Sequence, residues 1–271
     1  MNVVEALLPR AREDVEAALV VWRDLLVDVY GRDLICLYAK GSAVKSWDGP
    51  IDYVPTLSDL DLHLETALAG GLSETPAEAF DVALRLSTEH EARFRFARPD
   101  AFHLPRAQLS FLNDLHANPD VVLLPAGVRT LFGTDPEATA HDADGVRAVD
   151  RRQLQELGPV LAEIPRSLMD RSGIDLFTLV RRLTWRVSPT PVRLLSLAAD
   201  DPFAVWGWNR TRVVAALEAS GHAAIAAPYR SWYATGWRLE LDGWRDGGLM
   251  REAIAHGHAV LQGCFEAVRR S

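Results

Sequence analysis

Two short stretches of the chain carry residue types that could hold phosphate groups together with their metal ions. Gly41-Ser42 follows an apolar run, and Asp59-Leu60-Asp61 lies beyond a spacer. Gly41 lets the main chain approach a phosphate closely, and Ser42 offers a hydroxyl and a backbone N–H. Aspartates at positions i and i+2 of a strand leave the same face, and Mg²⁺ prefers such oxygen ligands. Together the stretches predict a site for a nucleoside triphosphate and bound metal ions.

Each of these signals also has an ordinary structural explanation. Gly and Ser are common in turns, and alternate aspartates on a strand often form a solvated face. Lys40 and Lys45, the only lysines of the chain, flank the Gly-Ser dipeptide. We expect them to offset triphosphate charge, and simple exposure at a strand end is the alternative. The order of the motif, an apolar strand, Lys-Gly-Ser, a spacer and Ser-Asp-Leu-Asp-Leu, is more specific than any of its parts.

The elements that must position these residues follow from the spacing of the apolar side chains. Helical spacing predicts a long helix over residues 3–30. A short helix starting near Ala43 would direct its positive end at an anion. Alternation along the next strand predicts that Asp59, Asp61 and His63 share one face. The other predicted elements are a strand over 34–39, a loop over 47–56, a strand over 59–65, a helix over 76–92, a strand over 101–104, an apolar run over 121–124 and a closing turn over 129–136.

The strand pattern stops near residue 150, and the rest of the chain has helical spacing broken by Gly, Pro and Asp. This pattern predicts a helical bundle. An Asp- and Ala-rich stretch, 137–150, is the candidate linker, so we predict one domain over 1–147 and another over 148–271. Six of the eight tryptophans lie between Trp185 and Trp244, where they form either core or an aromatic wall of a substrate cleft. The predicted helical segments are 151–171, 173–186, 190–199, 208–220, 223–241 and 248–270.

Composition and charge narrow the class of protein. The 271 residues are 48% apolar and 24% charged, and no apolar run approaches the about 20 residues of a membrane span. We therefore expect a soluble, cytoplasmic protein without a membrane partner. The net charge of −8 divides into −11 over residues 1–147 and +3 over residues 148–271. An acidic first half disfavours nucleic acid, which needs clustered positive charge, and favours a small cationic partner.

In their order, stretches 37–44 and 57–62 resemble the signature of the nucleotidyltransferase superfamily that includes DNA polymerase β. That signature is an apolar residue, Gly, Gly or Ser, a spacer, and then Asp, apolar, Asp or Glu, apolar. The sequence of these two stretches is most similar to the antibiotic-modifying branch, the aminoglycoside nucleotidyltransferases. Segment 131–136 also resembles a segment of that branch. The resemblance covers residues 1–136, and over the helical remainder it is architectural only.

The resemblance implies an α+β fold: a polymerase β-like nucleotidyltransferase domain with a mixed sheet, then an all-helical C-terminal domain that helps bind the acceptor. The active site would lie in the cleft between them. The implied reaction transfers a nucleoside monophosphate, AMP from ATP, to a hydroxyl of a small acceptor such as an aminoglycoside and releases pyrophosphate. Two Mg²⁺ ions would assist. The implied catalytic and metal-binding residues are Asp59, Asp61 and Asp100, and the implied nucleotide-binding residues are Gly41, Ser42, Lys45 and Ser58.

Asp100 is chosen as the third carboxylate because it precedes a predicted short strand. His103 would share its face, as a base or as a structural histidine. We expect most of the arginines near this strand to form a solvated helix end and one of them to meet a phosphate, because guanidinium suits that geometry. The alternatives for the third carboxylate are Glu89, Glu91, Asp114 and Asp120, and the nearby arginines are Arg93, Arg95, Arg98 and Arg106.

The motif also departs from the family pattern. Its spacer is longer than the family's, so we expect loop 47–56 to shape the entrance for nucleotide or acceptor. Lys40 stands where the family commonly has other residues. Two further functions are compatible with the sequence: transfer to a protein or tRNA hydroxyl, and a non-catalytic nucleotide-binding module.

Overall fold

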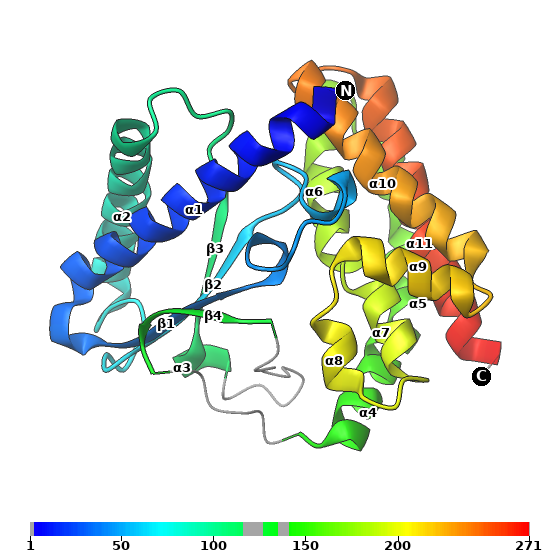
Figure 1. The fold of residues 1–271 in the computed structure, drawn as a ribbon, viewed down its shortest axis with the longest axis horizontal. Helices are drawn as coiled ribbons and strands as arrows, with labels where there is room; N and C mark the ends of the chain where they lie inside the picture. Colours follow the sequence, from blue (N-terminus) through cyan, green and yellow to red (C-terminus); the bar gives the residue numbers. More distant parts are fainter. Residues whose placement is uncertain (1–2, 116–126, 135–140, 271) are drawn as a thin grey trace. The chain divides into compact units, whose positions relative to one another are not determined.

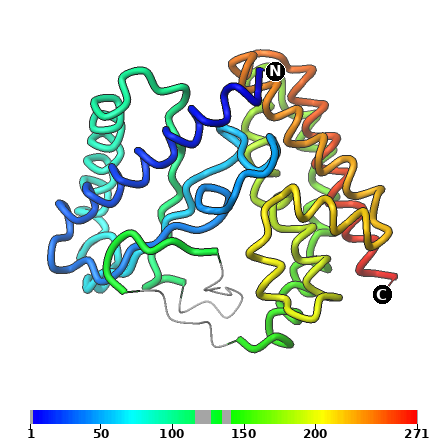
Figure 2. Tube along the Cα trace, in the orientation of Figure 1, coloured from blue at the N-terminus to red at the C-terminus, as the bar shows by residue number. Residues whose placement is uncertain are grey.

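The fold is α+β, with one small mixed sheet and many helices (Figures 1 and 2). The structure is a computed structural model that describes residues 3–115, 127–134 and 141–270. The predicted apolar run over 121–124 and Asp120 lie outside the described residues. In the described part of the chain, no helix combines the length and apolar character that crossing a membrane requires.

Two compact units share the chain, and neither is a single continuous segment. One unit comprises Met1–Lys45 and Ser58–Thr139, and the other comprises Ser46–Leu57 and Ala140–Ser271. The chain therefore passes from one unit to the other three times. This division differs from the single predicted boundary after residue 147, because the loop after the Gly-Ser turn belongs with the helices.

The sheet belongs to the first unit and has the strand order β3-β2-β1-β4. β1 pairs antiparallel with β2 and β4, whereas β2 pairs parallel with β3, so the predicted mixed sheet is confirmed. The strand predicted over 101–104 is wrong, and a strand replaces the predicted turn over 129–136. The strands are β1 Leu34–Lys40, β2 Leu60–Thr66, β3 Ala107–Phe111 and β4 Arg129–Gly133.

Alternation along β2 separates the two faces of the sheet. Leu60, Leu62 and Leu64 are fully buried on one face. Because successive side chains of a strand point to opposite faces, Asp61 and His63 lie on the other face, as predicted. The β1 register agrees, because it sets Lys40 opposite Asp61. Hydrophobic burial of the leucines therefore fixes which way the polar side chains of β2 point.

Two long helices of the first unit confirm the predicted helices over 3–30 and 76–92. α1 (Val3–Tyr30) packs on the sheet and on α2 (Pro76–Ala97), as Figure 1 shows. The side chain of Thr75 caps α2 by accepting from the backbone N–H of Glu78 at 3.3 Å. A short helix, α3 (Leu112–Leu115), follows β3.

The second unit confirms the predicted helical C-terminal region. Its first helix starts at Ala143, inside the predicted linker, because the side chain of Asp142 caps it through the N–H of Gly145. Trp232 and Trp237 are fully buried, so these two tryptophans belong to the core, while Trp185 is 58% exposed. The helices are α4 Ala143–Gln155, α5 Leu157–Met169, α6 Leu176–Val187, α7 Thr190–Ser196, α8 Pro202–Trp206, α9 Arg210–Ala219, α10 Ala223–Asp242 and α11 Gly247–Arg270.

A buried carboxylate attaches segment 46–57 to the helices of its unit. Asp52 is 1% exposed and accepts from the backbone N–H and the hydroxyl of Thr211 at 2.8 Å each. The same carboxylate accepts from the amides of Asp48 and Gly49, also at 2.8 Å. Since a buried charge must be hydrogen-bonded, these bonds account for the membership of the segment in the helical unit.

Candidate functional site

The Gly-Ser turn follows β1 directly and forms a single 3₁₀ turn over Gly41–Ala43. Gly41 has a φ of +77°, in the left-handed region that favours glycine. Its carbonyl accepts from the amides of Val44 and Lys45 at 3.3 Å each. The expected short helix starting near Ala43 does not form over residues 44–49, and the next helical turn, a 3₁₀ turn, begins at Pro50. This three-residue turn therefore does not provide the helix dipole that the sequence predicted.

Asp61, one of the two aspartates, lies beside this turn. Asp59 immediately precedes β2, and Asp61 is on the strand opposite Lys40. A Cβ atom built on Gly41 would lie 2.5 Å from Oδ2 of Asp61. The carboxylate of Asp61 and the turn are therefore in direct contact. Ser58, expected to contact nucleotide, is 1% exposed.

Arg106, the residue before β3, pairs with one of the two aspartates. One of its terminal nitrogens donates to Oδ2 of Asp59, and the side chains are 36% and 14% exposed respectively. Its Nε is buried and has no hydrogen-bond partner among the described atoms. The other three arginines of the predicted cluster bind carboxylates elsewhere: Arg93 binds Asp28 and Glu89, Arg95 binds Glu91, and Arg98 binds Glu13 and Asp14.

Lysine and histidine side chains complete the polar face of β1 and β2. Burial lowers the pKa of the Lys40 ammonium, and the negative charge of Asp61 opposes that shift. Burial, reinforced by the positive charge of Lys40, lowers the pKa of His63 to about 3. His63 is therefore neutral at physiological pH, and its ring stacks on Tyr38 with centroids 5.1 Å apart.

Asp100 is not where the sequence predicted it. It lies exposed in the turn after α2, and its backbone carbonyl accepts from Arg10 at 3.0 Å. Within residues 3–115, 127–134 and 141–270, no group of three or more His, Cys, Asp or Glu side chains is arranged to hold a metal ion. The structure therefore does not group Asp100 with Asp59 and Asp61.

A buried aspartate on α1 explains why residues 101–104 do not form a strand. Oδ2 of Asp14 accepts from the backbone amides of Phe102 at 2.8 Å and His103 at 3.1 Å. Nδ1 of His103 lies 3.2 Å from the same oxygen. These bonds consume the donors that a strand would offer to its neighbour. His103 is thus a structural histidine, the alternative to the predicted base.

The parallel strand β3 adds a residue, Gln108, that was not predicted from the sequence. Its register sets Gln108 beside Asp61, and Ser110 beside His63. Parallel neighbours at the same register point to the same face, so the amide of Gln108 shares a face with Asp61. The alternation of apolar residues at 107, 109 and 111 was the available signal for this strand.

The chemistry of Asp59 and Asp61 fits Mg²⁺. Their carboxylate oxygens are hard ligands, and Mg²⁺ is usually bound by one or two carboxylates completed by substrate phosphates and water. Two carboxylates without a third are therefore a sufficient protein contribution. In this protein Asp59 and Asp61 would hold the metal, and Gly41 leaves room for the Asp61 carboxylate beside the turn.

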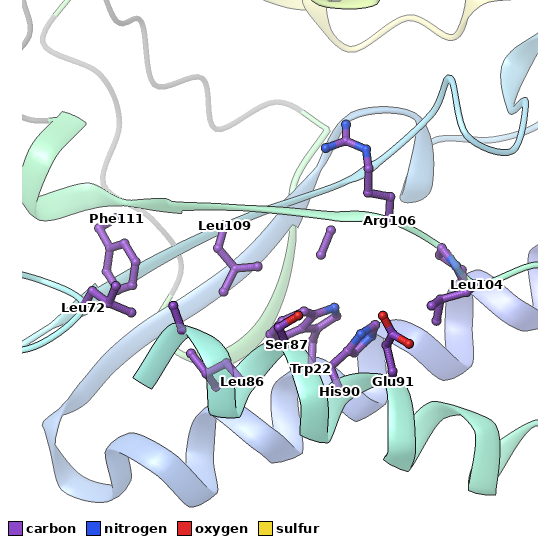
Figure 3. Close-up of a pocket in the computed structure, with 13 residues that line it drawn as sticks. Trp22, Leu72, Leu86, Ser87, His90, Glu91, Leu104, Arg106, Leu109 and Phe111 are labelled. Atoms are coloured by element: carbon purple, nitrogen blue, oxygen red, sulfur yellow. The ribbon is translucent and has the colours of Figure 1, made fainter. Parts of the chain in front are cut away.

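A pocket of about 440 Å³ lies on the other side of β3 (Figure 3). Its lining is mainly apolar and includes Trp22 of α1, His90 of α2 and Leu109 of β3. The rings of Trp22 and His90 stack with centroids 4.2 Å apart. In Figure 3 the guanidinium of Arg106 points away from these rings. Neither aspartate of the pair lines this pocket.

We compared the sequence with known protein families and with curated proteins. No known protein family matches the sequence, and no curated protein is significantly similar to it.

Proposed function

We propose that the protein is a metal-dependent nucleotidyltransferase that transfers a nucleoside monophosphate to a hydroxyl of a small acceptor. AMP from ATP is the proposed donor group, a cationic molecule such as an aminoglycoside is the proposed acceptor, and pyrophosphate is the second product. The observation that carries the proposal is the contact between the Gly41 turn and the Asp61 carboxylate. It brings a phosphate-binding type of turn against a metal-binding type of side chain.

The roles of the residues follow from their chemistry. Asp59 and Asp61 would hold Mg²⁺, which supplies charge stabilisation at the transferring phosphoryl group. Backbone and hydroxyl groups of Gly41 and Ser42 would hold the β and γ phosphates. The bond between the acceptor oxygen and the α phosphorus forms as the bond to pyrophosphate breaks, and the hydroxyl loses its proton. The contribution of the protein is mainly positioning and preorganised charge.

The polymerase β-like fold is part of the proposal. It is supported by a mixed sheet whose first two strands flank the Gly-Ser turn and carry Asp61, with a helical region after the sheet. Acceptor hydroxyls on a protein or a tRNA are alternatives within the same chemistry. The net charge of −11 over residues 1–147 favours a small cation over RNA.

A second candidate is a non-catalytic nucleotide-binding module. Arg106 pairs with Asp59, and Lys40 stands opposite Asp61. Cations thus neutralise the carboxylates without any metal, which is what a protein that no longer uses metal would retain. Nucleotide binding with no pyrophosphate release would favour this candidate.

A pyrophosphate-release screen tests the proposal. It combines Mg²⁺, each of the four nucleoside triphosphates and a panel of aminoglycosides. We expect release with at least one pair of substrates, and its loss in Asp59→Asn and Asp61→Asn. Asp100→Asn is the matched control, because that carboxylate is exposed and apart from the pair. Undiminished release in either Asp59→Asn or Asp61→Asn would refute the assignment.

A further inference from the structure

Arg12 of α1 holds the end of the Gly-Ser turn. One terminal nitrogen of its guanidinium donates to the carbonyl of Ala43 at 3.1 Å and to the carbonyl of Lys45 at 3.2 Å. These two acceptors lie 31 and 33 residues further along the chain. The first helix of the protein therefore fixes the backbone of a turn that forms much later in the sequence.

The carboxylate of Glu16 sets the direction of this guanidinium. It lies one turn further along α1, with Oε1 at 3.6 Å from Nε of Arg12. Oε2 of the same carboxylate accepts from Arg129 of β4 at 2.5 Å. Arg129 pairs with Ala39 of β1, two residues before Gly41. The guanidinium is thus tied to the helix and to the sheet, which limits the orientations open to its long side chain.

The bonds from Arg12 also decide which backbone atoms of the turn are already engaged. The carbonyls of Ala43 and Lys45 accept from Arg12. The carbonyl of Gly41 accepts from the amides of Val44 and Lys45. A phosphate is bound by N–H groups and repelled by the negative end of a carbonyl. Three of the five carbonyls in residues 41–45 are therefore directed to donors of the protein.

The same contact lies where the chain leaves the first unit. Lys45 is the last residue of that unit before the chain passes to the second unit at Ser46. Segment 46–57 is bound to the helices of the second unit through Asp52. Because α1 holds the carbonyl of Lys45, the shape of the turn is a property of the first unit, which also carries Asp61.

We propose that Arg12 is a positioning residue for the nucleotide: it keeps the carbonyls of Ala43 and Lys45 engaged within the protein and adds a permanent positive charge to the turn that meets the phosphates. This inference rests on the proposed function and adds to it a residue that acts on the phosphates through the turn. Arginine suits both tasks, because it is always charged and offers several donors from one planar group.

Calorimetric affinities for ATP and AMP in the presence of Mg²⁺ test this role. The turn would hold the β and γ phosphates, which AMP lacks. Arg12→Met keeps the apolar stem and removes the donors and the charge. We expect it to weaken ATP binding about tenfold, the equivalent of one charge-assisted hydrogen bond, and to leave AMP binding unchanged. Arg12→Lys keeps the charge and should restore part of the ATP affinity. Arg23→Met, which removes an exposed pair with Asp24 on the same helix, is the matched control.

A selective loss of ATP affinity, partly restored in Arg12→Lys, supports the role, and a purely structural arginine does not produce it. Equal losses of ATP and AMP affinity in Arg12→Met would overturn the proposal, because a general defect does not distinguish the two nucleotides. ATP affinity equal to that of the wild type would overturn it as well. Failure of the proposed function gives a different result: the wild-type protein then binds ATP no more tightly than AMP, and the role of Arg12 falls with it.

Discussion

Oδ2 of Asp61 occupies the place where a side chain at residue 41 would begin, 2.5 Å from an ideal Cβ on Gly41. This contact links the strand end to the aspartate pair more closely than spacing in the sequence alone implies. Any larger residue at 41 must move the carboxylate or the turn, because real Cβ atoms do not approach a neighbour so closely.

Gly41→Ala should therefore lower both the stability of the protein and its affinity for metal. The left-handed φ of +77° costs a non-glycine residue about 1–2 kcal/mol, and displacement of Asp61 should weaken Mn²⁺ binding at least tenfold. Urea unfolding measures the first effect, and electron paramagnetic resonance the second. Gly31→Ala is the matched control, because Gly31 has a φ of +53° and nothing within 4 Å of its Cβ position. Equal Mn²⁺ affinity in both variants would contradict a role of the contact in metal binding.

Asp14→Asn should loosen the segment that leads to Arg106. An asparagine loses charge-assisted bonds to the amides of Phe102 and His103, so we expect about 2–3 kcal/mol lower stability. Hydrogen exchange at these two amides should accelerate. The control is Asp28→Asn on the same helix, which removes an exposed pair with Arg93 and should cost less than about 1 kcal/mol. Unchanged protection in the Asp14 variant would show that the anchor lies elsewhere.

From the bonds of the Asp52 carboxylate we predict a small loss of stability in one variant of the helical unit and a larger loss in another. Thr211→Val removes the hydroxyl donor alone and should lower the free energy of unfolding by about 1 kcal/mol. Asp52→Asn disturbs all four bonds at a buried position and should cost about 2–4 kcal/mol. Guanidinium denaturation measures both. Similar costs for the two variants would mean that the hydroxyl carries most of the interaction.

His90 should make the protein sensitive to mild acid. Burial lowers its pKa from 6.5 to about 4, so between those values the unfolded chain binds the proton more strongly. The neutral His90 side chain therefore contributes fully to the free energy of unfolding above about pH 6.5, and this contribution is lost as the pH falls toward 4. From pH 7.5 to 5 this group alone should cost about 2 kcal/mol. Urea unfolding at both pH values should show a smaller loss in His90→Phe, which keeps a ring against Trp22. An equal loss in both proteins would assign the acid sensitivity to other groups.

Local periodicity was sufficient to predict the frame of the site. The alternation of β2 determines that Asp61 and His63 share a face, because the leucines between them must be buried. The long helix over 3–30 also follows from spacing alone. Both predictions depend on residues that are neighbours in the sequence, and that is why they hold.

Partners far along the chain account for what could not be predicted. Residues 101–104 have a strand-like composition, but Asp14 takes two of their amides. The pairing of Arg106 with Asp59 and the position of Gln108 beside Asp61 depend on the parallel register of β2 and β3. That register is set by packing across the sheet, so it cannot be predicted from residues that are neighbours in the sequence.

Segment 46–57 also imposes an order of events on the newly made chain. It leaves the ribosome directly after β1, yet its partner Thr211 on α9, and Trp237 on α10, which donates to the carbonyl of Pro50 at 2.8 Å, come much later. Residues 1–139 can therefore not finish folding as an isolated N-terminal fragment, because this segment must wait for the far end of the chain. Division of the gene after residue 139 should yield fragments that associate, because in the first fragment alone Asp52 keeps only the bonds from the amides of Asp48 and Gly49 and lacks both bonds from Thr211.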